Sequence, residues 1–425
     1  MGKRADQGFP DEAASVSPRL RWCICGGVGV AAALFLSPPA SRALATPCEP
    51  DAIASTGVLP ANFRISAVGD IIIQHPAAAL IRARAPQIAR LLSDADLSFG
   101  NFESNSFELG SPAAHARAPA DGPLVLAPPV VARELRALGF RLVSAANNHA
   151  GDWGPGGVLE TLGTLRKAGI VSAGTGATLA AARSPSCVRV RGAAVALIAV
   201  TSTFAKEDAA TAERPGVNAL HLSLQSGNYV VSRADLQALL AAIRAARRSA
   251  ALVLVSLHTH EPGTDAQHPP AFEVQLAHAA IDAGADAFIG HGPHTLRGIE
   301  IRQGKPIFYS LGNFAVMQPL EQINPMPMKI PPGSIFTRRE FFEGALISAR
   351  YDRGRLRTLV IQPFELSDSP EPASHGLPVA ATAAQADAIL ERLADLSRDL
   401  GTTLAVADGV GVVQIATPVS ASGRR

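Results

Sequence analysis

The sequence predicts an α/β fold in which a mixed β-sheet, or two stacked sheets, is covered by helices. Short apolar runs typical of buried strands alternate with stretches of helical period, and this alternation favours a parallel sheet. Two later pairs of runs flank glycine-containing turns and predict antiparallel hairpins. The chain has 425 residues, of which 47% are hydrophobic and 17% charged, so it can bury a large core.

The first element is an expected secretory signal peptide in residues 1–45. Basic residues precede an apolar run from Trp22 to Leu36, and the small-residue site Ala43-Leu44-Ala45 follows it. This run is shorter than the roughly 20 residues of a membrane-spanning helix. We therefore expect cleavage after Ala45 and export to the periplasm or the medium, with an uncleaved N-terminal membrane anchor as the alternative.

Charge and cysteine content restrict the partners and the compartment. The formal charge is +2, and the first 45 residues hold five Lys/Arg against three Asp/Glu, which leaves the remainder near neutrality. No nucleic-acid partner is expected of such a chain. Cys23 and Cys25 lie in the signal peptide, so Cys48 and Cys187 remain, either paired in an oxidising compartment or as two separate thiols.

Residues 46–366 form the predicted main domain. Its strands are expected at Phe63–Val68, Leu97–Phe99, Arg141–Ser144, Val195–Val200, Leu252–Leu257, Ala287–Ile289 and Ile307–Leu311. Its helices are expected at Ala77–Leu92, Pro129–Leu138, Gly157–Ala168, Arg233–Arg248 and Phe272–Ala283. The hairpins are expected to join Gly298–Ile301 to Ile307–Leu311 and Gly344–Tyr351 to Leu356–Phe364.

Residues 367–425 are expected to pack on the main domain as a loop, a helix and a strand. Residues 367–382 are rich in Pro, Ser and Ala, which is typical of a loop. An amphipathic helix is predicted at Ala383–Leu400, with a short strand near Gly411–Ile415. The tail Ser420–Arg425 is expected to be frayed.

Five of the apolar runs end in residue types that bind metal ions. The endings are Gly69-Asp70, Asn101-Phe102-Glu103, Asn147-Asn148-His149, His258-Thr259-His260-Glu261 and His291-Gly292-Pro293-His294. Open α/β sheets place their sites at the carboxyl ends of their strands, so we expect these side chains to meet. Carboxylate, amide and imidazole ligands suit Zn, Mn or Fe better than Ca or Mg.

These endings, with Gly304–Phe314, resemble the CapA-type poly-γ-glutamate capsule proteins, a branch of the calcineurin-like metallophosphatase superfamily. The resemblance spans roughly Ile65 to Phe314. It implies two stacked mixed β-sheets flanked by helices, a four-layer sandwich. It also implies a divalent transition-metal cofactor, expected as two ions of Mn, Fe or Zn. The ligands that the resemblance and the strand endings suggest are Asp70, Glu103, Asn148, His258, His291 and His294.

The resemblance implies metal-assisted hydrolysis of an acidic polymer or a phosphoester. Glu103 would bridge the two ions, and His149 would protonate the leaving group. Arg297 either holds an anionic group of the substrate or forms a surface salt bridge. A non-catalytic capsule or poly-γ-glutamate assembly or export protein that binds acidic polymer is the alternative, and capsule-assembly proteins at the cell envelope are expected partners in either case. The sequence contains neither a G-x-x-x-x-G-K-[ST] loop nor a G-x-S-x-G elbow, which argues against an ATP-dependent ligase and a serine hydrolase.

The sequence departs from the family pattern at three places. Ile72 stands where the superfamily's D-x-H motif has a histidine, an absence that the resemblance implies for the capsule-protein branch in general, so the metal pair is expected to be weaker or incomplete. His291 is a less secure ligand than His294, because the usual motif is His-Pro-His, whereas here Gly292 and Pro293 both separate the two histidines. His-Trp-Gly-x-Glu is replaced by a segment containing His260, which either compensates for the missing ligand or lines the pocket. The other histidines are expected to be structural or exposed: His75, His115, His221, His268, His278 and His375.

Overall fold

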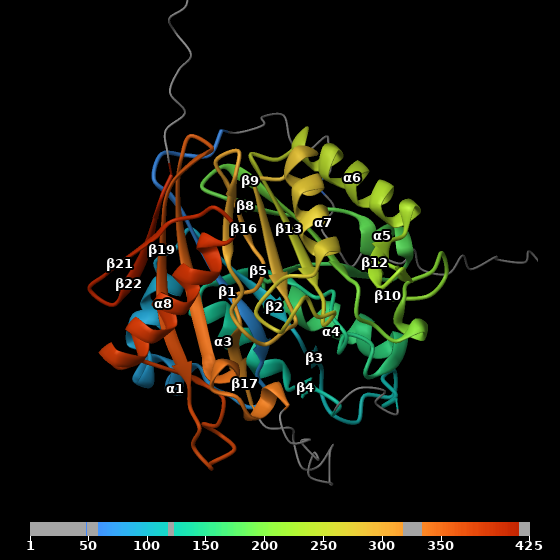
Figure 1. The fold of residues 1–425 in the computed structure, drawn as a ribbon. Coiled ribbons are helices and arrows are strands. Elements are labelled where there is room, and N and C mark those ends of the chain that lie inside the picture. Colours follow the sequence, from blue (N-terminus) through green and yellow to red (C-terminus); the bar gives the residue numbers. More distant parts are fainter. Residues whose placement is uncertain (1–47, 49–57, 118–122, 318–333, 416–425) are drawn as a thin grey trace, which may run out of the picture. The chain divides into compact units, whose positions relative to one another are not determined.

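The computed structural model describes residues 48, 58–117, 123–317 and 334–415 (Figure 1). The chain divides into a unit of residues 1–42 and a unit of residues 43–425, and every described residue belongs to the second. The predicted signal peptide, its cleavage site and the tail Ser420–Arg425 lie outside the described residues. In the described part no helix is long and apolar enough to cross a membrane.

The larger of two main sheets has ten strands and is mixed. In spatial order its main strands are β21 (Leu404–Ala407), β22 (Val410–Gln414), β19 (Arg355–Leu366), β18 (Glu343–Asp352), β1 (Phe63–Ile72), β2 (Leu97–Phe102), β5 (Phe140–Ser144) and β6 (Val171–Ala173). In addition, β17 (Asn313–Val316) pairs with β1, and β20 (Pro378–Val379) pairs with β19. Strand β1 is parallel to β2 and antiparallel to β18, so the parallel and hairpin portions meet at β1.

The second sheet has six strands and is also mixed. Its order is β15 (Ile299–Arg302), β16 (Lys305–Phe308), β14 (Ala287–His291), β13 (Leu252–His258), β9 (Ala193–Thr201) and β8 (Ser186–Val190). The central strands β9, β13, β14 and β16 are parallel, whereas the edge strands β8 and β15 are antiparallel to their neighbours.

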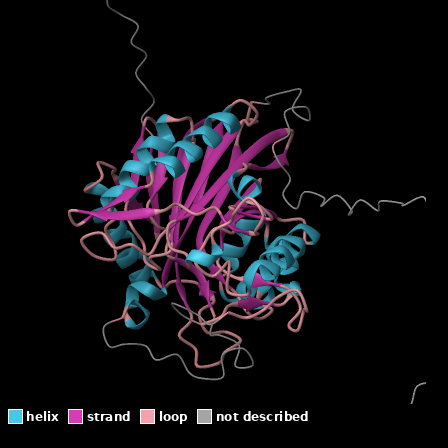
Figure 2. Cartoon of the chain, turned by 90° about the vertical axis from the view of Figure 1, so that its right-hand side faces the viewer, coloured by secondary structure: helices cyan, strands magenta, loops and turns pink. Residues whose placement is uncertain are grey.

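The two sheets stack, and helices cover their outer faces, as the resemblance implied (Figure 2). One core cluster joins apolar side chains of both sheets. A second lies between the larger sheet and helices α1 (Ala78–Arg84), α2 (Pro86–Ser93), α3 (Pro129–Leu138) and α4 (Gly154–Lys167). A third lies between the smaller sheet and helices α6 (Arg233–Arg247) and α7 (Ala271–Asp282).

Helix α8 (Ala383–Arg398) differs from these outer helices in its position. Its residues Ile389, Leu390 and Leu393 belong to the core between the sheets. The Thr382 hydroxyl and the Gln385 side chain form a capping box that fixes its first turn. The segment after residue 366 therefore adds strands to the larger sheet and fills the core between the sheets.

The predicted helix Ala77–Leu92 was wrong, because the segment forms two helices. Ala85 leaves the helical region with φ −131° and ψ 58°, and α2 begins at Pro86. Proline lacks the N–H that would continue the helix and disfavours the helical conformation of the preceding residue. Both hairpins and the remaining predicted helices are present within a few residues of their expected bounds.

Several short elements were not predicted. Within the main sheets they are β6, β8, β17, β20 and β21. Outside these sheets they are β3 (Asn105–Ser106) with β4 (Leu126–Ala127), β7 (Thr175–Gly176) with β10 (Gly216–Val217), the hairpin of β11 (Leu222–Gln225) and β12 (Asn228–Val231), helix α5 (Leu179–Arg183), and the 3₁₀ turns η2 (Lys206–Asp208), η3 (Ile335–Thr337) and η4 (Arg339–Phe342).

A disulfide joins Cys48 to Cys187 of β8, which decides between the two alternatives left open by the sequence. The Cα atoms are 5.2 Å apart, and both cysteines pack against the core on the outer face of the smaller sheet. The bond fastens the start of the described chain to an edge strand.

Candidate metal centre

Asp70 lies in an irregular part of β1, which pairs there with β2 on one side and with β17 on the other. Its backbone N–H donates to the Gly312 carbonyl at 3.0 Å. The register of β1 shifts beside Asp70 against both β2 and β17. Gly69 permits this approach, because a Cβ at that position would overlap the Gly312 carbonyl oxygen. The irregularity directs the carboxylate of Asp70 toward the second sheet, where the Gly292 N–H donates to its Oδ2 at 3.1 Å.

Asn101 at the end of β2 orients the Asp70 carboxylate. Its Nδ2 donates to Asp70 Oδ1 at 2.8 Å and lies 3.2 Å from His258 Nδ1. Burial raises the pKa of Asp70, but the neighbouring His291 and His294 outweigh it and hold that pKa well below its usual range. Asp70 is therefore a charged carboxylate in a fully buried position.

Glu103 follows β2 and is the most informative residue of the site. Its side chain is 0% exposed, and within the described part of the chain neither carboxylate oxygen has a hydrogen-bond partner. Burial, with the charge of Asp70 nearby, raises the pKa of Glu103 to about 8. A buried carboxylate without donors is costly, so this position calls for a cation.

His258 ends β13, and His260 lies two residues beyond it. His258 Nε2 lies 3.8 Å from Glu103 Oε1 and 3.1 Å from His260 Nε2. Burial and His260 lower the pKa of His258 well below its usual value. His260 is solvent-exposed as a residue, yet the protein around its ring and the charge of His294 lower its pKa to about 3. Both imidazoles are thus neutral near pH 7, which is the form that binds metal ions.

His294 follows β14 in a strained conformation. Its φ is 55°, the left-handed region that a non-glycine residue seldom occupies. Its Nδ1 lies 2.8 Å from Asn313 Oδ1, so Nδ1 carries the proton and Nε2 faces Glu103 Oε1 at 3.9 Å. Burial lowers the pKa of His294, but Glu103 and Asp70 outweigh it and raise that pKa to about 9.

His291 is fully buried beside Asp70. Its Nδ1 lies 3.5 Å from Asp70 Oδ1, and neither ring nitrogen makes a hydrogen bond to any residue the structure describes. An imidazole with two unpartnered nitrogens in a buried site is free to bind an ion.

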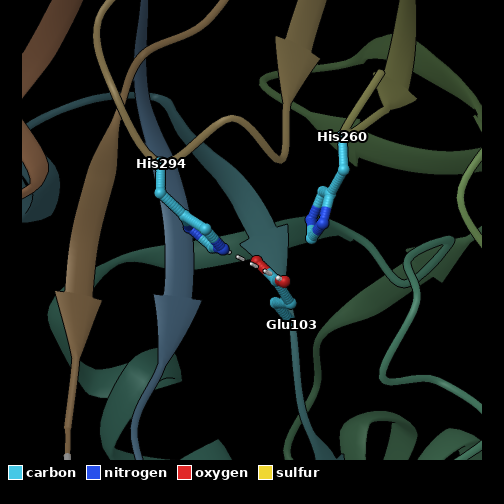
Figure 3. Close-up of side chains that lie close together, drawn as sticks. All are labelled: Glu103, His260 and His294. Carbon is cyan, nitrogen blue, oxygen red and sulfur yellow. Dashed lines mark ion pairs between the residues drawn. The ribbon is translucent and has the colours of Figure 1, made fainter. Parts of the chain in front are cut away.

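Two groups of side chains place one ligand atom each within 4.8 Å of the others. They are Asp70, Glu103 and His258, and Glu103, His260 and His294. Figure 3 shows the second group, with Glu103 between the two histidines. The groups share Glu103, whose unpartnered oxygens fit a role between ions. These buried acidic and histidine residues can therefore hold a metal ion.

The turn between β5 and α4 supplies Asn148 and His149. Asn148 Oδ1 is buried and has no hydrogen-bond partner in the described ranges, as expected of a ligand oxygen. His149 Nδ1 lies 3.0 Å from Asp152 Oδ2, so its Nδ1 carries a proton and its Nε2 is available. Burial lowers the pKa of His149, but Asp152 outweighs it and raises the pKa above its usual value.

Arg297 does not form the surface salt bridge considered from the sequence. Its side chain is 1% exposed and makes a buried ion pair with Glu273 at 2.7 Å, while its Nε donates to the Ala266 carbonyl at 3.0 Å. The difference arises because the partner, Glu273 on α7, is itself 0% exposed. The ion pair therefore lies inside the protein and not on its surface. The guanidinium is thus engaged by protein groups, and the expectation that it holds an anionic group of the substrate stays a prediction.

Sequence reasoning assigned no role to three residues that now support the site. Asn101 and Asn313 lie inside the motifs described above, and Asp152 follows the Asn148-His149 pair. Their roles could not be predicted, because Asp70 and His294, the partners of the two asparagines, are distant in sequence. The contact of Asp152 with His149 depends on side-chain rotamers. Most of the other histidines have partners of their own. His221 pairs with Asp235, His268 with Asp265 and His278 with Glu300, and His375 contacts the Ser369 carbonyl.

Comparison with known proteins locates a family match over this site. Residues 64–318 match the family described as Bacterial capsule synthesis protein PGA_cap. An uncharacterized protein of Sinorhizobium fredii is 30% identical over 430 residues, which cover 83% of this chain and 93% of that protein. The PGA biosynthesis protein CapA of Bacillus subtilis is 35% identical over 185 residues, covering 43% of this chain and 44% of CapA. A probable polyglutamine synthesis accessory protein of Mycobacterium tuberculosis is 37% identical over 183 residues, or 42% and 46% of the two chains.

Proposed function

The chain belongs to the bacterial capsule synthesis protein PGA_cap family, and on that premise we propose that it is a metal-dependent hydrolase of capsule or poly-γ-glutamate metabolism. The observation that supports hydrolysis is the buried, unpartnered carboxylate of Glu103, which two groups of potential ligands share. In its ionised form this carboxylate has no hydrogen-bond donor, and a bound cation would supply the stabilisation that its burial removes.

The proposed metal ligands are Asp70, Glu103, Asn148, His258, His291 and His294. Divalent ions of Mn, Fe or Zn in this site would act as Lewis acids toward a phosphoryl or carbonyl oxygen and would lower the pKa of a water molecule. The protein fixes the ligands through a second set of hydrogen bonds, from Asn101 to Asp70 and between His294 and Asn313.

His149 is the proposed general acid. Asp152 accepts a hydrogen bond from its Nδ1 and is itself held by the Val125 N–H at 2.8 Å. This arrangement fixes the ring and leaves Nε2 to donate a proton to the leaving group of the substrate. The raised pKa of His149 favours the imidazolium form, which carries the transferable proton on Nε2.

The proposed substrate is an acidic polymer of the poly-γ-glutamate kind, with a phosphoester as the alternative. The name of the Bacillus subtilis relative, PGA biosynthesis protein CapA, supports the first. We further propose that the chain is exported and works with capsule-assembly proteins at the cell envelope. The Cys48–Cys187 disulfide supports an oxidising compartment.

The test combines elemental analysis with hydrolysis assays. Protein lacking residues 1–45 would be purified, its metal content measured, and its activity recorded on poly-γ-glutamate and on a phosphomonoester. Asp70→Ala and His149→Ala should each lower kcat at least about 100-fold, while only Asp70→Ala should lower metal content. His268→Ala, whose exposed ring pairs with Asp265, is the matched control. Metal-free, inactive wild-type protein would refute the proposal.

Ile72 favours a second candidate, a non-catalytic protein that binds acidic polymer. It places an apolar side chain, 7% exposed, where a metallophosphatase has a histidine ligand. Binding of poly-γ-glutamate that persists in Asp70→Ala and His294→Ala, together with absent hydrolysis, would favour this candidate over the enzyme.

A further inference from the structure

We propose that His260 is a metal ligand of this chain, binding an ion together with Glu103 and His294. The inference rests on the metal site of the proposed function but concerns a residue outside the family's ligand pattern. It assigns a chemical role to the imidazole that the sequence left either as a ligand or as part of the pocket wall.

The first support is the direction of the ring. His260 Nε2 lies 3.1 Å from His258 Nε2, and the ring centroid of His260 is 4.9 Å from that of His258 and 5.5 Å from that of His294. One ligand atom each of His260, Glu103 and His294 lies within 4.8 Å of the others. Two ligand atoms on one transition-metal ion, each about 2.1 Å from it, lie roughly 3 to 4 Å apart, so a small adjustment of these side chains would bring them onto one ion. In Figure 3 the ring of His260 points toward Glu103 from the side opposite His294.

The second support is that the protein holds His260 in this position. Its backbone N–H donates to the Thr203 hydroxyl at 2.8 Å. The next residue, Glu261, accepts hydrogen bonds from Ser202 at 2.7 Å and from Thr203 at 3.2 Å. These bonds join the turn after β13 to the turn after β9, so the position of His260 is built into the ends of two neighbouring strands.

Gly292 provides the space for the ring. A Cβ at Gly292 would come within 2.9 Å of His260 Cδ2, and its φ of 108° suits glycine alone. The imidazole therefore packs on the backbone of the loop that carries His294.

The third support is the ligand count. Ile72 stands where the wider metallophosphatase superfamily has an imidazole ligand, and its apolar side chain cannot replace that ligand. His260 returns an imidazole to the site from a different strand. Because His260 is the exposed member of its group, the ion it binds would be the one nearer to solvent and substrate.

A proton shared between His258 and His260 is the competing explanation of their 3.1 Å contact. It requires no ion, and His258 Nδ1 faces the Asn101 amide in a way that allows a proton on Nε2. The two explanations differ in what happens to bound metal when His260 is removed.

The experiment titrates metal-free protein with Co²⁺ and follows both heat and the visible absorption of the bound ion. His260→Ala and the similarly sized His260→Gln are compared with wild type and with His268→Ala. Each His260 variant should lose one ion, or bind it at least about 10- to 100-fold more weakly, with a changed absorption band. His268→Ala should match wild type in both measurements.

Unchanged Co²⁺ stoichiometry, affinity and absorption in either folded His260 variant would overturn the inference. Hydrolysis by wild type is measured separately, so failure of the His260 inference can be told apart from failure of the proposed function. A wild type that binds Co²⁺ through His260 but hydrolyses nothing refutes the proposed function alone. A wild type that binds no Co²⁺ refutes both.

Discussion

At the scale of single residues, the site brings together buried titratable groups whose charged forms are costly away from water. Glu103 and His294 both have pKa values raised above their usual range, to about 8 and about 9. A bound cation would remove the need for either proton, because it would neutralise the carboxylate and take the imidazole as a neutral ligand.

This arrangement predicts how the stability of the metal-free protein depends on pH. A group whose pKa is raised on folding stabilises the protein fully below its unfolded pKa and loses that contribution as the pH passes its folded pKa. For Glu103 the loss runs from about pH 4.5 to 8, and for His294 from about 6.5 to 9. His258 and His260 have lowered pKa values and act in the opposite direction below about pH 6.5. The Tm in a chelator should therefore fall between about pH 6.5 and 9, and saturating Mn²⁺ should flatten the curve. A chelated protein whose Tm rises over this range would contradict the prediction.

Asp152 offers a second prediction at this scale. Its removal in Asp152→Asn should lower the pKa of His149, because the Asp152 charge is what raises it against burial. The alkaline limb of the kcat profile, where the acid loses its proton, should then move to lower pH, and kcat at its optimum should fall about 10- to 1,000-fold. Metal content should stay unchanged, and a profile that keeps its alkaline limb would argue against His149 as the acid.

At the scale of elements, the site depends on how β1 meets the turn before β17. The Gly69 backbone lies against the Gly312 carbonyl with no room for a methyl group. This contact determines where Asp70 leaves the strand and where Asn313 begins the next one.

Gly69→Ala should therefore be strongly destabilising, by about 3 kcal/mol or more, since a backbone atom must move to make space. The matched control is Gly163→Ala in α4, where a Cβ would meet no atom within 4 Å. That substitution should be neutral or stabilise by up to about 1 kcal/mol, because alanine is the better helix former. Urea unfolding of both variants measures the difference, and equal effects would show that the Gly69 contact is not tight.

Elements with strong periodicity could be predicted from the sequence, and so could the convergence of their ends. Parallel strands bring their carboxyl ends to one edge, which is why Asp70, Glu103 and His258 were expected to meet. The break at Ala85 was missed because the helical period continues across Pro86. The partners of Arg297 and His294 could not be predicted, because Glu273 and Asn313 reach them only through the packing of separate elements.

At the scale of the whole molecule, one covalent bond closes a long part of the chain. Cys48 and Cys187 are 139 residues apart, and the loop between them includes β1, β2 and β5. Such a bond stabilises the fold mainly by restricting the unfolded chain, and the effect grows slowly with loop length.

Cys187→Ser should lower the free energy of unfolding by about 2 to 5 kcal/mol. Guanidinium unfolding with and without dithiothreitol checks this value. Reductant should destabilise wild type to the level of the variant and leave the variant itself unchanged. Equal stability of oxidised wild type and Cys187→Ser would mean that the cross-link contributes little.

The pairing of β1 with β18 affects where the chain can be truncated for expression. The family match stops at residue 318, whereas β18 begins at Glu343. A fragment that ends at residue 318 would lack β18, the antiparallel partner of β1. The edge of β1, the strand that carries Asp70, would then be unpaired and could form β-sheet contacts between molecules, which leads to aggregation. We therefore expect a fragment of residues 64–318 to be less stable and more prone to aggregate than the whole chain.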